Sequence, residues 1–104
     1  MGLFNWLFGK KDNALLENMI KDGAFLVDVR TPLEYSQGHV KGSVNIPLDK
    51  ILVNATQFKN KKNCIVFCRS GARAAQAKRI LDKMGVANVA NAGTWEYING
   101  LLNN

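Results

Sequence analysis

Apolar residues recur along this chain in two alternating patterns, one with helical spacing and one of short unbroken runs. Residues 14–20 carry apolar positions at helical spacing, Asn13 can cap their first turn, and Gly23 can end the helix. Residues 25–29 then form a short β-rich run that is bounded by Gly23 and by Thr31-Pro32. The pattern therefore predicts a helix that is followed by a buried strand.

The rest of the chain repeats this alternation. Short strands are expected at residues 44–46, 64–67 and 86–90, and helical segments at residues 48–58, 74–84 and 95–102. Strands that alternate with helices, and that are apolar on both faces, indicate a parallel sheet covered by helices. The predicted fold class is α/β, with a central parallel β-sheet of four or five strands and helices on both faces.

The length of the chain indicates one domain, because 104 residues of which 47% are hydrophobic suffice for one core but not for two. We expect residues 13–104 to form this single domain and residues 1–12 to be an apolar N-terminal tail. Contact of residues 3–8 with a membrane surface or a partner, and packing over the domain's own core, stay open as alternatives. The tail is too short to span a bilayer and lacks the pattern of a secretory signal, so we expect a cytoplasmic protein.

Charge and cysteine content exclude several classes of function. The net charge is +6, but the lysines are scattered from Lys10 to Lys83, so we expect no nucleic-acid partner. A basic surface does favour small anionic substrates. Cys64 and Cys68 are too far apart in an extended run to form a disulfide, and with His39 as the single histidine they cannot assemble a zinc site. We therefore expect no metal and no cofactor.

Cys68 stands where a parallel sheet places its ligand site, directly after a predicted strand. It begins the loop Cys68-Arg69-Ser70-Gly71-Ala72-Arg73, which leads into a helix. Gly71 relaxes the backbone, so that successive amides can turn toward the Cys68 sulfur and form an anion cradle. These amides, the helix N-terminus and the two arginines favour the thiolate, which is the nucleophilic form. We expect a reactive sulfur that can be reached from solvent.

Two residues near this loop allow a structural interpretation. Arg73 stands in the first turn of its helix, where the macrodipole disfavours a cation, and either a bound anion or a nearby carboxylate can offset this repulsion. Cys64 lies beside Ile65 in an apolar run, and we interpret it as a small buried hydrophobe without a chemical role.

The motifs of this chain resemble those of the rhodanese family. Residues 25–30, Glu34-Tyr35 and residues 38–47 (GHVKGSVNIP) resemble the first half of a rhodanese domain, and residues 65–73 (IVFCRSGAR) resemble the active-site loop. Residues 77–85 and 91–93 are similar to the short phage-shock-type members. Because the motifs are paired and in their usual order, the signal is more specific than a single short match.

The resemblance implies a thiosulfate sulfurtransferase that moves a sulfane sulfur from a donor such as thiosulfate to cyanide or a thiol through a Cys68 persulfide. The implied partners are a small anionic donor and a thiol or cyanide acceptor, with a sulfur-carrier protein as a further candidate. The anion cradle would comprise Arg69, Ser70, Gly71, Ala72 and Arg73, with the two arginines as orienters of the donor. A supporting group of ion pairs and hydrogen bonds would comprise Asp28, Arg30, Glu34 and His39.

The chain departs from the family pattern at two places. It lacks a strand ahead of its first predicted helix, and Gly93-Thr94 stands where a Gly-Gly pair is usual. Two other functions stay open. One is a non-catalytic binding module. The other is a phosphatase or arsenate reductase of the same fold, but those proteins have five residues between the cysteine and the arginine, whereas Cys68 and Arg73 are separated by four.

Overall fold

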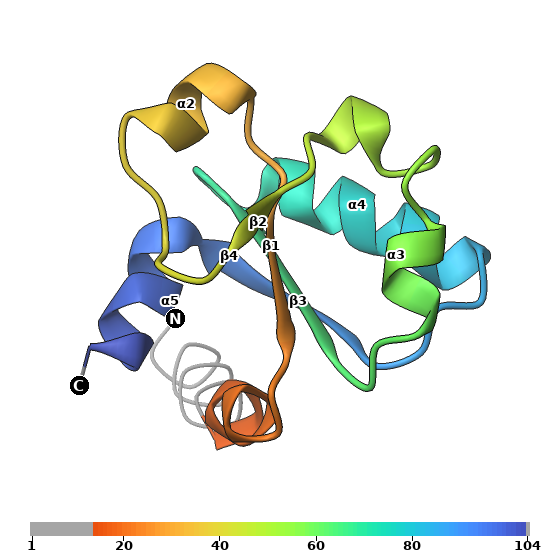
Figure 1. Cartoon of the computed structure of the whole chain (residues 1–104), viewed down its shortest axis with the longest axis horizontal. Coiled ribbons are helices and arrows are strands. Elements are labelled where there is room, and N and C mark those ends of the chain that lie inside the picture. Colours follow the sequence, from red (N-terminus) through yellow and green to blue (C-terminus); the bar gives the residue numbers. More distant parts are fainter. Residues whose placement is uncertain (1–13, 104) are drawn as a thin grey trace, which may run out of the picture.

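A parallel sheet forms the centre of the fold, and the order of its strands is β2-β1-β3-β4. The computed structural model describes residues 14–103 (Figure 1). Within these residues the four strands are β1 (Phe25–Asp28), β2 (Val44–Asn45), β3 (Cys64–Cys68) and β4 (Val89–Thr94), and every pairing is parallel. The predicted α/β class with a parallel sheet is confirmed, and the described strands number four.

Helices cover both faces of this sheet. They are the first helix (residues 14–21), α2 (Pro32–Ser36), α3 (Thr56–Lys59), α4 (Ala72–Lys83) and α5 (Trp95–Leu102), with a 3-10 turn η1 (Leu48–Lys50). Figure 1 shows α3 and α4 on one side of the sheet, and α5 with the first helix on the other. The alternation of strands and helices therefore closes into two helical layers around one sheet.

The central strand β3 divides the core into two halves. Cys64, Val66 and Cys68 are buried in the cluster that includes residues of α4, whereas Ile65 and Phe67 are buried in the cluster that includes residues of the first helix and α5. Successive side chains of a strand point to opposite faces, so this alternation follows from the strand itself. Packing from both sides fixes the carboxyl end of β3, where Cys68 lies.

Two elements differ from their predicted bounds by more than two residues. Residues 48–58, expected as one helical segment, comprise η1, a run of turns and the short α3. The last strand, expected at residues 86–90, begins only at Val89. The reason is the end of α4: the amide of Val86 donates to Leu81 O and the amide of Gly85 to Asp82 O, which is a Schellman cap. Val86 therefore belongs to the end of the helix.

The sequence prediction missed α2. Thr31 and Glu34 form a capping box, in which the Glu34 amide donates to Thr31 Oγ1 at 3.2 Å and the Thr31 amide donates to Glu34 Oε1 at 2.9 Å. Pro32 occupies the first turn, where its missing amide costs nothing. A short helix with these end signals needs no long apolar stripe, which is why the apolar periodicity did not reveal it.

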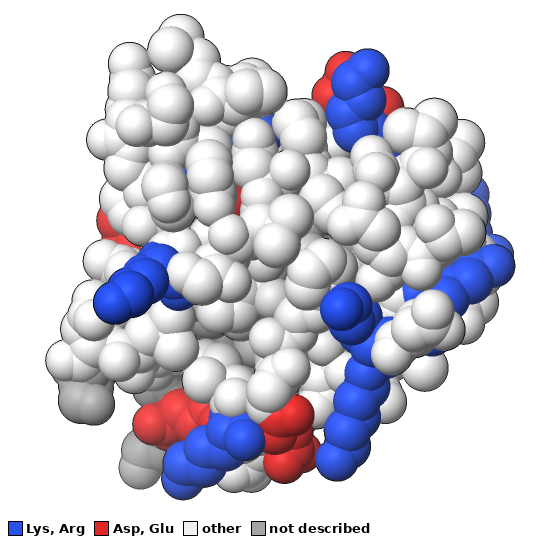
Figure 2. Space-filling model, viewed as in Figure 1, with Lys and Arg blue, Asp and Glu red and all other residues white. Residues whose placement is uncertain are grey.

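The predicted tail at residues 1–12, and the membrane contact considered for residues 3–8, lie outside the described residues. Within residues 14–103, no helix combines the length and the apolar character that a transmembrane segment needs. On the face drawn in Figure 2, the basic side chains lie at several separate places, and acidic side chains stand beside some of them.

Candidate active site

Cys68 is the last residue of β3, and the loop after it folds back over its sulfur. The amide of Gly71 donates to Cys68 Sγ at 2.9 Å, and the amide of Ala74 in the first turn of α4 donates to the same atom at 3.4 Å. Each amide presents the positive end of its N–H dipole to the sulfur. The arrangement therefore favours negative charge on Cys68 Sγ.

The conformation of this loop depends on Gly71. Its φ of 98° lies in the left-handed region, and a Cβ at this position would come within 3.4 Å of the Cα of Gly93. Asn91 Nδ2 donates to Gly71 O at 3.4 Å, and the amide of Gly93 donates to Asn91 Oδ1 at 2.8 Å. The end of β4 therefore braces the loop that surrounds Cys68. Sequence reasoning assigned no role in the site to Asn91.

The Cys68 side chain is fully buried, with 0% of its surface exposed. The expectation of a sulfur that solvent can reach was therefore wrong. The reason is the tightness of the loop, because the same two amides that point at the sulfur also bring the backbone of residues 71–74 down onto it. Arg69, Ser70 and Ala72 are exposed, so the sulfur lies directly beneath a surface loop rather than deep in the core.

Arg73 is paired with a carboxylate. Its Nη1 lies 2.7 Å from Glu34 Oε1, and its Nη2 donates to Glu34 Oε2 at 3.0 Å. The hydrogen bond from Arg73, followed by that from the Thr31 amide, lowers the pKa of Glu34 from 4.5 to about 2. The pKa of Arg73 is raised, first by its hydrogen bond to Glu34, with weaker electrostatic contributions from Cys68 and Asp28. The Glu34 carboxylate therefore offsets the unfavourable interaction between the Arg73 cation and the helix dipole.

Asp28 and Arg30 form a buried ion pair at the carboxyl end of β1. Arg30 Nη2 lies 2.7 Å from Asp28 Oδ2, and Arg30 Nε and the Arg30 amide each donate to Asp28 Oδ1 at 2.9 Å. The guanidinium also donates to Gly38 O at 2.7 Å and lies over the Trp95 ring, 4.7 Å from its centroid. Arg30 therefore links the end of β1 to the loop after α2 and to α5.

His39 contacts α2, and within residues 14–103 it makes no hydrogen bond or ring contact with the Cys68 loop. Its ring stacks on that of Tyr35 with the centroids 3.8 Å apart, and its Nδ1 lies 2.8 Å from Tyr35 O. The Tyr35 hydroxyl in turn donates to Ser43 O at 2.6 Å. These contacts fit a supporting role in the connection between α2 and β2.

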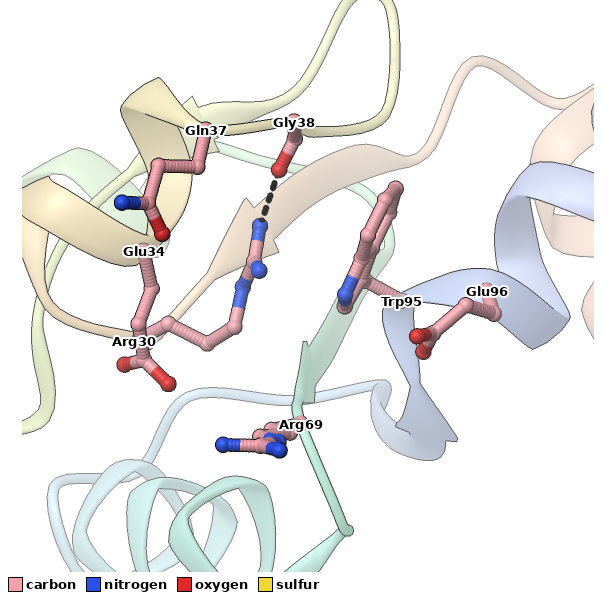
Figure 3. A pocket seen from close by; sticks show the side chains of 7 residues that line it. All are labelled: Arg30, Glu34, Gln37, Gly38, Arg69, Trp95 and Glu96. Carbon is pink, nitrogen blue, oxygen red and sulfur yellow. Dashed lines mark hydrogen bonds between the residues drawn. The ribbon is translucent and has the colours of Figure 1, made fainter.

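A pocket of about 290 Å³ opens beside the Cys68 loop (Figure 3). Its lining comprises Glu34 of α2, the C-cap residue Gln37, Arg69 from the loop, and Trp95 and Glu96 of α5, together with Arg30 and Gly38. Sequence reasoning missed Trp95 and Glu96. They directly follow the carboxyl end of β4, and the rule that drew attention to Cys68 applies equally to this neighbouring strand.

The second cysteine is placed differently. Cys64 is fully buried in the sheet, and this burial raises the pKa of its thiol, against a weaker lowering by Lys61. The thiol form is unreactive, which fits the interpretation of Cys64 as a packing residue. Among residues 14–103, no three His, Cys, Asp or Glu side chains lie close enough together to hold a metal ion.

Comparisons of this sequence with a family model and with known proteins agree on one family. The family model described as Rhodanese-like domain matches residues 12–95. Thiosulfate sulfurtransferase PspE of Escherichia coli is 44% identical over 69 residues, which cover 64% of this chain and 66% of that protein. A sulfurtransferase of Allochromatium vinosum is 33% identical over 70 residues, covering 67% of this chain and 65% of that protein. The chain therefore spans just under two thirds of the length of these relatives.

A solved structure agrees with the sequence comparisons. The structure described as rhodanese with anions from E. coli superposes with a TM-score of 0.63 and 38% identity, over 72% of this chain and 91% of that chain.

Proposed function

Because this chain belongs to the rhodanese-like domain family, we propose that it is a sulfurtransferase that carries a sulfane sulfur on Cys68. The observation that carries the proposal is the convergence of the Gly71 and Ala74 amides on Cys68 Sγ. The names of the E. coli and A. vinosum relatives support the same class of activity. A thiolate is the form of cysteine that attacks sulfur, and these amides favour it.

In the first half-reaction, the Cys68 thiolate attacks the outer sulfur of thiosulfate. A new S–S bond forms as the bond between the two thiosulfate sulfurs breaks, and sulfite leaves with the bonding electrons. Cys68 then holds a persulfide with one negative charge. The amides of Ala72 and Arg73 belong to the first turn of α4, where N–H groups have no acceptor within the helix, and we assign them to the terminal sulfur.

We assign the orientation of the anionic donor chiefly to Arg69. The Arg69 side chain is exposed and lines the pocket, whereas both terminal nitrogens of the Arg73 guanidinium already donate to the Glu34 carboxylate. Arg73 then acts as a positioning residue that fixes α2 beside the loop.

In the second half-reaction, cyanide or a thiolate attacks the terminal sulfur of the persulfide. The S–S bond breaks, its electrons return to Cys68 as thiolate, and the product is thiocyanate or a new persulfide. A sulfur-carrier protein is the macromolecular acceptor that this chemistry also fits. The cytoplasmic location stays a prediction.

The burial of Cys68 favours one competing function, a non-catalytic module that uses the fold only for binding. Transfer requires the exposed loop residues Arg69, Ser70 and Ala72 to move aside, because the thiosulfate sulfur must come within bonding distance of Sγ.

Intact mass spectrometry after incubation with thiosulfate decides between these functions. The sulfurtransferase gains one sulfur, which cyanide removes, and Cys68→Ser gains none. Cys64→Ser is the matched control and gains the sulfur as the original chain does. A chain that gains no sulfur while it remains folded is the binding module.

A further inference from the structure

The pocket beside the Cys68 loop is larger than an inorganic sulfur donor requires. Its volume is about 290 Å³. Thiosulfate and cyanide have only five and two heavy atoms. The space is close to the lower end of the range for pockets that bind small organic molecules.

Four of the charges around this pocket are neutralised in pairs. Arg30 is bound to Asp28, and Glu34 is bound to Arg73. Arg69 and Glu96 also line the pocket, both are exposed, and the structure records no ion pair or hydrogen bond for either side chain within residues 14–103. The pocket therefore offers one available cation and one available anion.

These two charges come from different elements that border the same space. Arg69 directly follows Cys68, so its Cα lies ~3.8 Å from that of the sulfur-bearing residue. Glu96 stands in the first turn of α5, next to Trp95, whose ring forms an apolar wall of the pocket (Figure 3). A ligand that spans the pocket would meet positive charge near the sulfur, an aromatic surface, and negative charge on the α5 side.

We propose that this pocket binds the sulfur acceptor, and that the acceptor is a small zwitterionic thiol with a carboxylate for Arg69 and an ammonium group for Glu96. The inference rests on the proposed function, because it assigns the second substrate of the same site. The acceptor thiol loses its proton to solvent and attacks the terminal sulfur of the Cys68 persulfide. The S–S bond breaks, Cys68 leaves as thiolate, and the acceptor becomes a persulfide with the total charge unchanged.

Glu96 also has a structural explanation, since an acidic residue in a first turn stabilises a helix by interacting with its dipole. The two explanations differ in what they predict for substrates. Loss of helix stability affects every acceptor equally, whereas loss of an ammonium partner affects only acceptors that carry an ammonium group.

The experiment compares four thiols at saturating thiosulfate, with sulfite release as the common measurement. Cysteine carries both charges, cysteamine only the ammonium group, 3-mercaptopropionate only the carboxylate, and 2-mercaptoethanol neither. In a two-step mechanism, kcat/KM for the acceptor does not depend on the donor step. For each thiol, we divide kcat/KM of the variant by kcat/KM of the original chain, because this ratio cancels the intrinsic reactivity of the thiol.

Glu96→Gln is expected to lower kcat/KM for cysteine and cysteamine about fivefold more than for the other two thiols, as loss of an exposed ion pair of about 1 kcal/mol would do. Arg69→Gln is expected to lower it selectively for cysteine and 3-mercaptopropionate. Glu96→Asp retains the charge and should recover part of the loss. Glu17→Gln, a change on the exposed face of the first helix, is the matched control and leaves all four ratios near one.

Equal losses for all four thiols in Glu96→Gln and Arg69→Gln would overturn the inference, as would failure of every thiol to accept sulfur while cyanide does. In both cases the original chain still releases sulfite from thiosulfate when cyanide is the acceptor, so the sulfurtransferase function stands. If thiosulfate with cyanide releases no sulfite, the proposed function itself fails.

Discussion

Glu34 and Arg73 stand 39 positions apart in the sequence and meet in a two-pronged ion pair, with N–O distances of 2.7 and 3.0 Å. Glu34 belongs to α2 and Arg73 to the first turn of α4, so the pair joins two of the elements that surround the Cys68 loop. It also places a negative charge beside a helix N-terminus, where the helix dipole favours one.

This pair gives a prediction about stability and pH. The pKa of Glu34 is about 2 in the folded chain against an ordinary 4.5, so the folded state favours the ionised carboxylate. The stabilisation is therefore complete above about pH 5 and is lost as the pH falls toward 2. Glu34→Gln should lower the free energy of unfolding by up to about 1 kcal/mol at pH 7, and by much less near pH 2.

Urea unfolding of both chains across this pH range measures the effect. Glutamine can still complete the capping box with Thr31, so the change isolates the charge. Asp82→Asn, which breaks the exposed pair with Lys78 on α4, is the control for a surface ion pair. A Glu34→Gln effect that stays constant from pH 7 to pH 2 would contradict the role given to the ion pair.

The two cysteines should respond in opposite ways to replacement by serine. Cys68→Ser should reduce thiocyanate formation to the background rate with little loss of stability, because a serine oxygen can still accept from the Gly71 amide. Cys64→Ser should lower the free energy of unfolding by about 1–3 kcal/mol, because the serine hydroxyl is buried. Within residues 14–103, the hydrogen-bond partner recorded for the Cys64 sulfur is Phe58 O, which is as far away as 4.0 Å. The folded fraction of Cys64→Ser should retain transfer.

Kinetics per folded molecule, with urea unfolding in parallel, separate these outcomes. Transfer that survives in Cys68→Ser, or that disappears in fully folded Cys64→Ser, would show that the wrong cysteine has been assigned.

The central strands of the sheet were predicted well because the local sequence pattern of each is typical of a strand. The run at residues 64–67 is β-rich and fully buried. The run at residues 25–29, which is bounded by turn residues, is half-buried at its first two positions and buried after them, so local pattern and tertiary environment agree. The sequence predicted the short elements poorly. α2 depends on the capping box of Thr31 and Glu34, which a search for apolar periodicity does not detect.

The candidate site was predicted in part. The position of Cys68 at the carboxyl end of β3, and the need for glycine at position 71, follow from local rules about strand ends and backbone freedom. Local rules do not predict the burial of the sulfur or the pairing of Arg73 with Glu34. Both features depend on how closely segments that are distant in the sequence approach one another, and the spacing of residues within the loop does not specify those distances.

Gly71 gives a further prediction, because its backbone conformation constrains the residue type. Its φ of 98° disfavours any side chain, and a Cβ would lie in van der Waals contact with Gly93 at 3.4 Å. Gly71→Ala should therefore lower the free energy of unfolding by about 1–2 kcal/mol and also reduce sulfur transfer strongly, since the amide that contacts Cys68 would shift. Thiocyanate formation and urea unfolding measure the two effects.

Gly85 provides the control for this prediction. Its φ is 81°, it caps α4 at the end remote from Cys68, and a Cβ would meet nothing within 4 Å. Gly85→Ala should lose a similar amount of stability and retain transfer per folded molecule. Equal retention of transfer in both variants would mean that the conformation at position 71 is not needed for the chemistry.

The last prediction concerns how the buried Cys68 is reached. Both cysteines are fully buried, and they are the two end residues of β3. Cys68 is followed directly by the exposed loop residues Arg69 and Ser70, whereas Cys64 is paired with Phe25 of β1 on one side and with Val89 of β4 on the other. Local opening of a surface loop costs less free energy than unfolding of a core strand. Alkylation by iodoacetamide should therefore modify Cys68 well before Cys64. Peptide mass spectrometry over a time course gives both rates.

The dependence of these rates on urea identifies the kind of opening. Local opening exposes little surface, so the rate at Cys68 should change little at low urea, while the rate at Cys64 should rise steeply with the fraction of unfolded chain. Persulfide formation on Cys68 should follow the first pattern, because thiosulfate needs the same movement of the loop. If both cysteines instead react at one rate that follows global unfolding, the loop does not open in the folded chain and Cys68 cannot serve as a sulfur carrier.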